Sequence, residues 1–213
     1  MWRYRHEASE VIRFGPHCVL EELQQVTLVG SLSRGSIPDS LMKSLLGAYN
    51  VDGVRAIQWG SDHESTAIAE YVKQYKVNLL QCGLFLYNSG LLGASPDCLE
   101  RDDSLVEVKC PYSWRDSTIC DVLQKSPKFL TLTASSELII NPEHDFYHQC
   151  HGQLHLSQRA RLNFFVWLPS GSLRISVVRD ENWGRDYIPV LLTFALDNLL
   201  PAYFKQLCPR DLC

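Results

Sequence analysis

Two carboxylates and a lysine are the residues of this chain best suited to chemistry. Asp97 follows a Ser-Pro pair. Glu107 and Lys109 alternate with valines in the segment 105–110, so they share one face of a predicted strand. If that strand pairs with the segment 91–95, Asp97 lies beside Glu107. Such a site could hold a hard divalent cation, and the ammonium would be left for a water molecule or a phosphate.

The same residues have a plainer interpretation. A Glu-x-Lys pattern on a strand is typical of a solvated face with an ion pair, and Ser-Pro-Asp is a common turn. The three residues alone therefore do not establish an active site, and the accompanying motifs decide between the two interpretations.

The spacing of Asp97 and Glu107-x-Lys109 resembles the PD-(D/E)XK nuclease signature. The longer sequence pattern ASPD…EVKCP resembles that of the phage lambda exonuclease and YqaJ-type viral recombinase family. Further segments match that family in the same order: Trp59-Gly60 with Glu64, Tyr147-x-Gln149 with Gln153, and a terminal strand–helix region. The resemblance covers residues 37–205.

This resemblance implies a fold and an activity. The fold is α/β (α+β), a restriction-endonuclease-like core in which a mixed β-sheet is flanked by helices. The activity is that of a metal-dependent DNA exonuclease that hydrolyses duplex DNA from its ends, 5′-to-3′. The family's segment for a 5′ phosphate is not recognisable in residues 1–36, which leaves the polarity open. A structure- or site-specific endonuclease could use the same site, and a DNA-binding module without catalysis is a third interpretation.

The resemblance also implies roles for individual residues. It places the metal ligands, for Mg²⁺ or a substituting Mn²⁺, at four positions: Asp97, Glu107, Glu64 and the carbonyl of Val108. The metal would activate a water molecule, and Lys109 would orient or deprotonate that water and stabilise the developing charge. Gln149 would position water or substrate. Ring-like trimers are also implied, although the sequence itself does not show a homo-oligomer.

Glu64 has two interpretations. With Ser61 it forms a Ser-x-x-Glu pattern, which is typical of a capping box at the start of a helix. The helix predicted over 56–75 instead places Glu64 in line with Ile68 and Tyr71, on a core-facing stripe. An unpaired carboxylate is costly there unless it meets a cation, so we favour a place in the site.

The net charge of −4 provides no general basic field, so DNA would have to be held by a local patch. Arg115, Lys125 and Lys128 follow the site in the chain and are candidates for phosphate contacts, although such residues usually form a solvated surface. Gln153, on a helix predicted over 143–156, is a further candidate for a DNA contact.

Composition bounds the class of protein. A chain of 213 residues with 46% hydrophobic residues predicts one globular domain over 1–213, of which 1–36 is the least readable part. We expect no membrane association, because no apolar run approaches about eighteen residues. Eight scattered cysteines without a CxxC pair predict an intracellular, reducing compartment, with nucleus and cytoplasm not distinguishable. The group of Cys150 and three nearby histidines lacks the spacing of known structural zinc sites.

The remaining elements are predicted from periodicity and turn residues. Strands are expected over 79–87, 129–132, 137–140, 163–168 and 173–178. One helix is expected after Asp39. A last amphipathic helix over 182–200 should be strained by Pro189 and end at Pro201.

Overall fold

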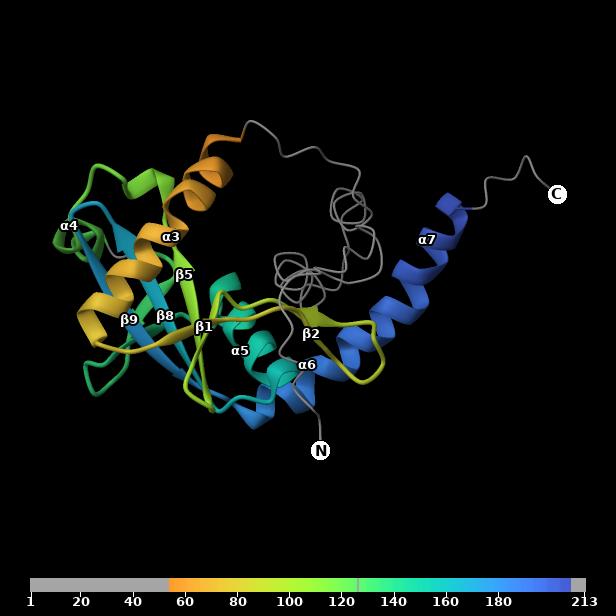
Figure 1. Ribbon diagram of the computed structural model, residues 1–213. Coiled ribbons are helices and arrows are strands. Elements are labelled where there is room, and N and C mark those ends of the chain that lie inside the picture. Colours follow the sequence, from red (N-terminus) through yellow and green to blue (C-terminus); the bar gives the residue numbers. More distant parts are fainter. Residues whose placement is uncertain (1–53, 126, 208–213) are drawn as a thin grey trace.

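The computed structural model describes residues 54–125 and 127–207 (Figure 1). The expectations for residues 1–36 and for the helix after Asp39 lie outside these ranges. The elements in chain order are α3 (Arg55–Tyr75), β1 (Leu79–Gln81), β2 (Phe85–Leu86), β3 (Gly93–Ala94), β4 (Cys98–Glu100), β5 (Ser104–Lys109), the 3₁₀ turn η1 (Tyr112–Trp114), α4 (Ile119–Gln124), β6 (Leu130–Leu132), β7 (Leu138–Ile140), α5 (Asp145–Ser157), β8 (Arg161–Leu168), β9 (Gly171–Val178), α6 (Glu181–Phe194), the π-helical turn η2 (Ala195–Leu199) and α7 (Leu200–Leu207).

A five-stranded sheet forms the centre of the described chain, in the order β1-β4-β5-β8-β9. The β5–β8 pair is parallel and the other neighbours are antiparallel, so the sheet is mixed as expected. Two separate antiparallel pairs, β2–β3 and β6–β7, lie outside it. The strand that carries Glu107 and Lys109 is therefore the middle strand of the sheet.

The predicted pairing of 91–95 with 105–110 is wrong, because another segment is the partner of β5. The segment that pairs with β5 is β4, and Cys98 lies opposite Val106. β3 pairs instead with β2. The reason is burial, because Leu92 and Ala94 pack in a separate cluster with residues of α6. Asp97 still directly precedes the strand beside β5, as the site requires.

Helices cover both faces of the sheet, and the alternating side chains of β5 pack against α3 on one face and α5 on the other. Val106 and Val108 pack with Ala67 and Tyr71 of α3. Leu105 packs in the opposite direction, in the same cluster as Leu154 of α5. The expected alternation of β5 is thus confirmed, and it directs Glu107 toward α5.

The α3 helix excludes the capping-box interpretation of Glu64. It begins at Arg55, and its N-cap residue, Val54, makes no side-chain capping bond. Ser61 and Glu64 therefore lie inside the helix, where the backbone amides already have intrahelical partners. The other predicted elements are found with small shifts, except that 79–87 is divided into β1 and β2.

The end of the chain departs from two expectations. The helix does not end at Pro201, which is the second residue of α7. Proline is tolerated there because it lies just after the π-helical turn, in which the N–H of Leu200 donates to the carbonyl oxygen of Ala195, five residues back. Figure 1 shows η2 and α7 continuing α6 away from the sheet.

The continuous helix formed by α6, η2 and α7 contains a longer apolar stretch than the sequence pattern indicated. Glu181–Lys205 spans 25 residues, and one 18-residue stretch of it is apolar enough to cross a membrane by length and composition alone. Its first half is a core helix in which Trp183 and Leu191 are buried, whereas Leu196 and Phe204 are exposed. Core helices pass the same test, so it carries no conclusion about a membrane.

Candidate active site

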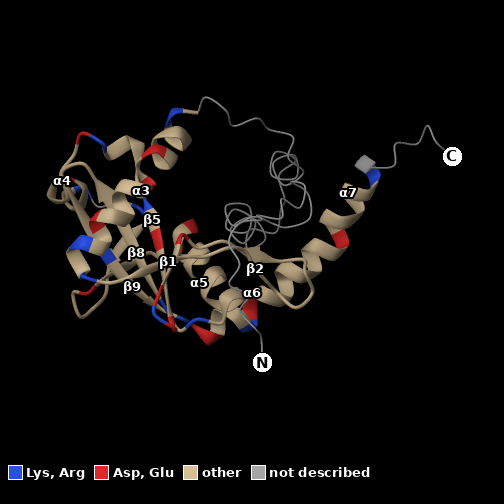
Figure 2. Cartoon of the chain, in the orientation of Figure 1, with Lys and Arg blue, Asp and Glu red and all other residues tan. Residues whose placement is uncertain are grey.

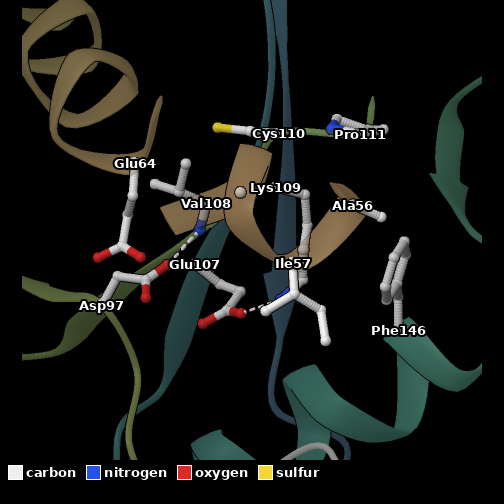
Figure 3. Close-up of a pocket in the computed structure, with 11 residues that line it drawn as sticks. Ala56, Ile57, Glu64, Asp97, Glu107, Val108, Lys109, Cys110, Pro111 and Phe146 are labelled. Atoms are coloured by element: carbon white, nitrogen blue, oxygen red, sulfur yellow. Dashed lines mark hydrogen bonds and ion pairs between the residues drawn. The ribbon is translucent and has the colours of Figure 1, made fainter. Parts of the chain in front are cut away.

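A cavity of about 360 Å³ opens where β5 ends, between α3 and α5 (Figure 3). Four side chains expected in the site form its polar part: Glu64, Asp97, Glu107 and Lys109. Val108 lines it as well. Four further residues form an apolar part: Ala56, Ile57, Pro111 and Phe146. Residues from three distant parts of the sequence thus meet in one cavity.

Asp97 is held against the middle strand. The backbone N–H of Val108 donates to Asp97 Oδ2 at 2.6 Å. Burial is the largest cause that raises the pKa of Asp97 to about 8, and the charge of Glu107 is the second. The carboxylate of Glu64 raises this pKa further by a smaller amount. Figure 3 shows the carboxyl groups of Glu64 and Asp97 side by side. The site thus concentrates negative charge.

Glu107 is almost enclosed, with 3% of its surface exposed. Gln149 Nε2 donates to its Oε1 at 2.8 Å, and Gln153 Nε2 donates to its Oε2 at 2.7 Å. Lys109 Nζ also donates to Oε1. These donors offset the cost of burying the carboxylate charge.

Gln149 contacts Glu107 of the candidate site, whereas Gln153 does not lie at the surface that a DNA contact requires. Gln153 is 0% exposed, so the prediction that it contacts DNA is wrong. Gln149 is 3% exposed, and the partner of its amide N–H is Glu107. The sequence indicated that the two side chains share one helical face, but not that this face is turned toward β5.

Lys109 lies between an acidic and an aromatic partner. Its ammonium pairs with Glu107 and lies 5.6 Å from the centre of the Phe146 ring. The Lys109 side chain is 20% exposed, so it can reach a ligand in the cavity. Phe146 was missed from the sequence, although its spacing of three residues from Gln149 places it on the same helical face.

Glu64 occupies the mouth of the cavity. It is exposed, whereas Ala67 and Tyr71, one and two turns further along α3, are fully buried. The predicted stripe is therefore core-facing up to the point where α3 passes beyond the end of the sheet. Glu64 lies at that point, directed into the cavity and not into packed core.

The Trp59-Gly60 motif has a structural explanation. The Trp59 ring stacks on His63 with the ring centres 3.7 Å apart, and it meets Tyr112 edge-on at 5.9 Å. These contacts join α3 to η1, the turn that follows β5. Gly60 lines the cavity. The motif therefore shapes the wall that carries Glu64.

The predicted basic residues do not line the cavity. None of Arg115, Lys125 and Lys128 is among the cavity-lining residues. The Arg115 guanidinium lies 4.1 Å from the centre of the Tyr112 ring and pairs with Asp116. Lys125 and Lys128 are exposed near α4. Figure 2 shows acidic and basic residues interspersed in this part of the described chain.

The histidines of α5 take part in packing. Trp183 Nε1 donates to His148 Nδ1 at 3.0 Å, and His155 Nε2 contacts the carbonyl oxygen of Asp180 at 2.8 Å. Burial lowers the pKa of His151 to about 4. These rings join α5 to α6 and so support the helix that carries the glutamines.

A divalent cation fits the chemistry of the cavity. In the part of the chain that the structure describes, no three histidine, cysteine or acidic side chains are already grouped as metal ligands. Nevertheless, three carboxylates face one cavity, and burial together with the nearby charge of Glu107 raises the pKa of Asp97, so a cation would stabilise its ionised form. Hard oxygen donors of this kind suit Mg²⁺ or Mn²⁺.

The fold and the acidic cluster define a PD-(D/E)XK-type protein, and sequence comparison identifies the family. The YqaJ-like viral recombinase domain family matches residues 28–160, a range that contains all the polar cavity residues. The chain therefore belongs to the YqaJ-like viral recombinase domain family, the lambda exonuclease branch of the PD-(D/E)XK superfamily.

Individual relatives agree with this assignment. The chain is 26% identical over 149 residues to an alkaline nuclease of Orgyia pseudotsugata multicapsid polyhedrosis virus, an alignment that covers 60% of this chain and 35% of that protein. It thus spans about a third of that relative's length.

Solved structures show the same fold. The alkaline exonuclease LHK-Exo from Laribacter hongkongensis superimposes with a TM-score of 0.63 at 19% identity, covering 90% of this chain and 91% of that one. A phage-related exonuclease from Haemophilus somnus 129PT gives a TM-score of 0.57 at 15% identity, with 87% and 93% covered. The expected restriction-endonuclease-like core is confirmed.

Proposed function

We propose that this chain is a metal-dependent DNA exonuclease that hydrolyses phosphodiester bonds from the ends of duplex DNA, in the 5′-to-3′ direction. The observation that carries the proposal is the meeting of Asp97, Glu107 and Lys109 in one cavity, with Glu64 at its mouth. The names of its relatives, an alkaline nuclease and two exonucleases, support it.

The residues divide the chemistry between them. Asp97, Glu107, Glu64 and the carbonyl of Val108 would hold Mg²⁺ or Mn²⁺. A bound metal supplies an activated water and neutralises charge on the phosphate. Lys109 stabilises negative charge as the phosphate is attacked, because its ammonium is partly exposed at the cavity. Without a cation the carboxylates repel a phosphate, so activity should require metal absolutely.

We assign DNA binding to basic residues outside the cavity. Arg115, Lys125 and Lys128 lie just after β5 in the chain, and a net charge of −4 leaves little general affinity for a polyanion. Charge reversal at the three positions should weaken binding and reduce its salt dependence, while the midpoint of metal activation stays unchanged.

The test uses end-labelled linear duplex and covalently closed circular DNA, incubated with the full chain and Mg²⁺. Linear DNA should shorten from its ends, circles should survive, and EDTA should stop the reaction. Lys109→Ala should lower the rate by about 10²–10⁴-fold. Lys73→Ala is the matched control, because Lys73 is an exposed lysine in the last turn of α3.

Two results would contradict the proposal. If circles are nicked as fast as linear DNA is shortened, the site belongs to an endonuclease. If Lys109→Ala retains full activity, the cavity is not the site of hydrolysis. Labels placed on the 5′ or the 3′ end separately decide the polarity.

A further inference from the structure

Two buried amides converge on one carboxylate in this structure. Gln149 and Gln153 are one turn apart on α5, and each directs its Nε2 to a different oxygen of Glu107, at 2.8 and 2.7 Å. The three residues are at most 3% exposed. Their arrangement fixes both the position of the carboxylate and the plane in which it lies.

Gln153 is a buried polar side chain whose hydrogen-bonding capacity is only partly used. Its amide oxygen is buried and has no hydrogen-bond partner among the described residues. An unsatisfied buried acceptor destabilises a fold, whereas an apolar side chain of similar length would fill the same space without that cost. The hydrogen bond that Gln153 does make goes to Glu107. The residue is therefore better explained by what it does to Glu107 than by packing.

The three donors to Glu107 differ in how easily they can leave. The glutamines are enclosed between α5 and the sheet, whereas the Lys109 side chain is 20% exposed. A carboxylate has about four lone-pair sites. Among the described residues, Gln149 and Lys109 reach Oε1 and Gln153 reaches Oε2. A ligand in the cavity could therefore join at Oε2 or replace the ammonium, but not the amides.

We propose that Gln153 is a positioning residue, which with Gln149 clamps the Glu107 carboxylate so that its remaining lone pairs face the divalent cation. The inference rests on the proposed function, because it takes Glu107 to be a metal ligand. It also explains why a glutamine first interpreted as a DNA contact lies beneath the site. Lys109 then acts as the exchangeable partner, leaving Glu107 when the cation arrives.

The test measures Mn²⁺ binding by the full chain without DNA, from the electron paramagnetic resonance signal of the free ion. Gln153→Met removes the donor and keeps the length of the side chain. It should raise the Mn²⁺ concentration for half-saturation about tenfold or more, as loss of a group that orients a ligand does elsewhere. Its thermal midpoint should change little, because the lost donor to the buried Glu107 carboxylate is offset by removal of the unsatisfied amide oxygen. At saturating Mn²⁺ much of the hydrolysis rate should return.

Leu154→Ala is the control for loosening of α5. Leu154 is fully buried on the same helix and packs with Leu105 and Phe164, so the variant is destabilised without touching Glu107. It should bind Mn²⁺ like the wild type. If Gln153→Met does not fold, Gln153→Asn withdraws the amide by one methylene and serves in its place.

The outcomes separate the two proposals. Unchanged Mn²⁺ binding in folded Gln153→Met would overturn the clamp, and so would an equal loss in Leu154→Ala. A wild-type protein that binds no Mn²⁺ would instead overturn the metal site itself, and with it the proposed function. A shifted midpoint in Gln153→Met alone supports the clamp whatever DNA the enzyme prefers.

Discussion

The substitution Asp97→Asn should stabilise the metal-free protein in a pH-dependent manner. Burial and the nearby Glu107 raise the pKa of Asp97 from its ordinary 3.8 to about 8. Below pH 3.8 the carboxyl is protonated in both the folded and the unfolded chain. Between these values the unfolded chain has released a proton that the folded protein keeps, so the free energy of unfolding falls as pH rises. The full penalty is present above about pH 8.

The magnitude follows from the size of the pKa change. At about 1.4 kcal/mol for each pH unit, a rise from 3.8 to about 8 corresponds to as much as about 6 kcal/mol. That is a large fraction of the 5–15 kcal/mol, roughly, that stabilises a typical domain. Asparagine carries no charge, and its amide oxygen still accepts the N–H of Val108, so the variant should avoid the penalty and keep the hydrogen bond.

Urea unfolding in EDTA, repeated from pH 5 to pH 8.5, measures the difference between variant and wild type. The difference is the useful quantity because His151, whose pKa is lowered to about 4, acts in the opposite direction in both proteins. The variant should gain stability over the wild type as pH rises. Mg²⁺ should then stabilise the wild type at pH 8 but not the variant, which should also lose hydrolysis. A difference that stays constant with pH would refute the electrostatic account of the site.

Further predictions concern the walls of the cavity and the α5–α6 contact. Glu64→Gln should lower the hydrolysis rate and raise the Mg²⁺ concentration for half-activation together, whereas a wild-type titration would leave Glu64 without a metal role. Phe146→Leu should lower the rate a few-fold by removing an aromatic face worth about 0.5–1 kcal/mol to the neighbouring ammonium, and an unchanged rate would remove Phe146 from the site. Gly184→Ala should cost about 1–3 kcal/mol in urea unfolding because its new Cβ would lie 2.4 Å from the His155 ring, while Gly60→Ala in open space should be neutral or stabilising.

Local pattern in the sequence determined much of the site. Strand alternation put Val106 and Val108 on the face opposite Glu107, and the structure confirms this because α3 and α5 cover opposite faces. The order of the motifs identified the family. Helical spacing put Gln149 and Gln153 on one face of a helix.

Only the tertiary structure decided which segments pack against those faces. Leu92 and Ala94 could pair with β5 by pattern, but burial against α6 removes them from the central sheet. Gln153 and an exposed glutamine look alike in the sequence, because the burial of a polar side chain depends on a partner 46 positions away.

The helix at the end of the chain shows the same division. Pro201 predicts a stop, yet the π-helical turn before it lets α7 continue. Periodicity reports which residues share a face, and it extends only over neighbouring turns or strand pairs. The identity of the surface packed against that face depends on contacts between distant segments, so the clamp on Glu107 became visible only once α5 lay against β5.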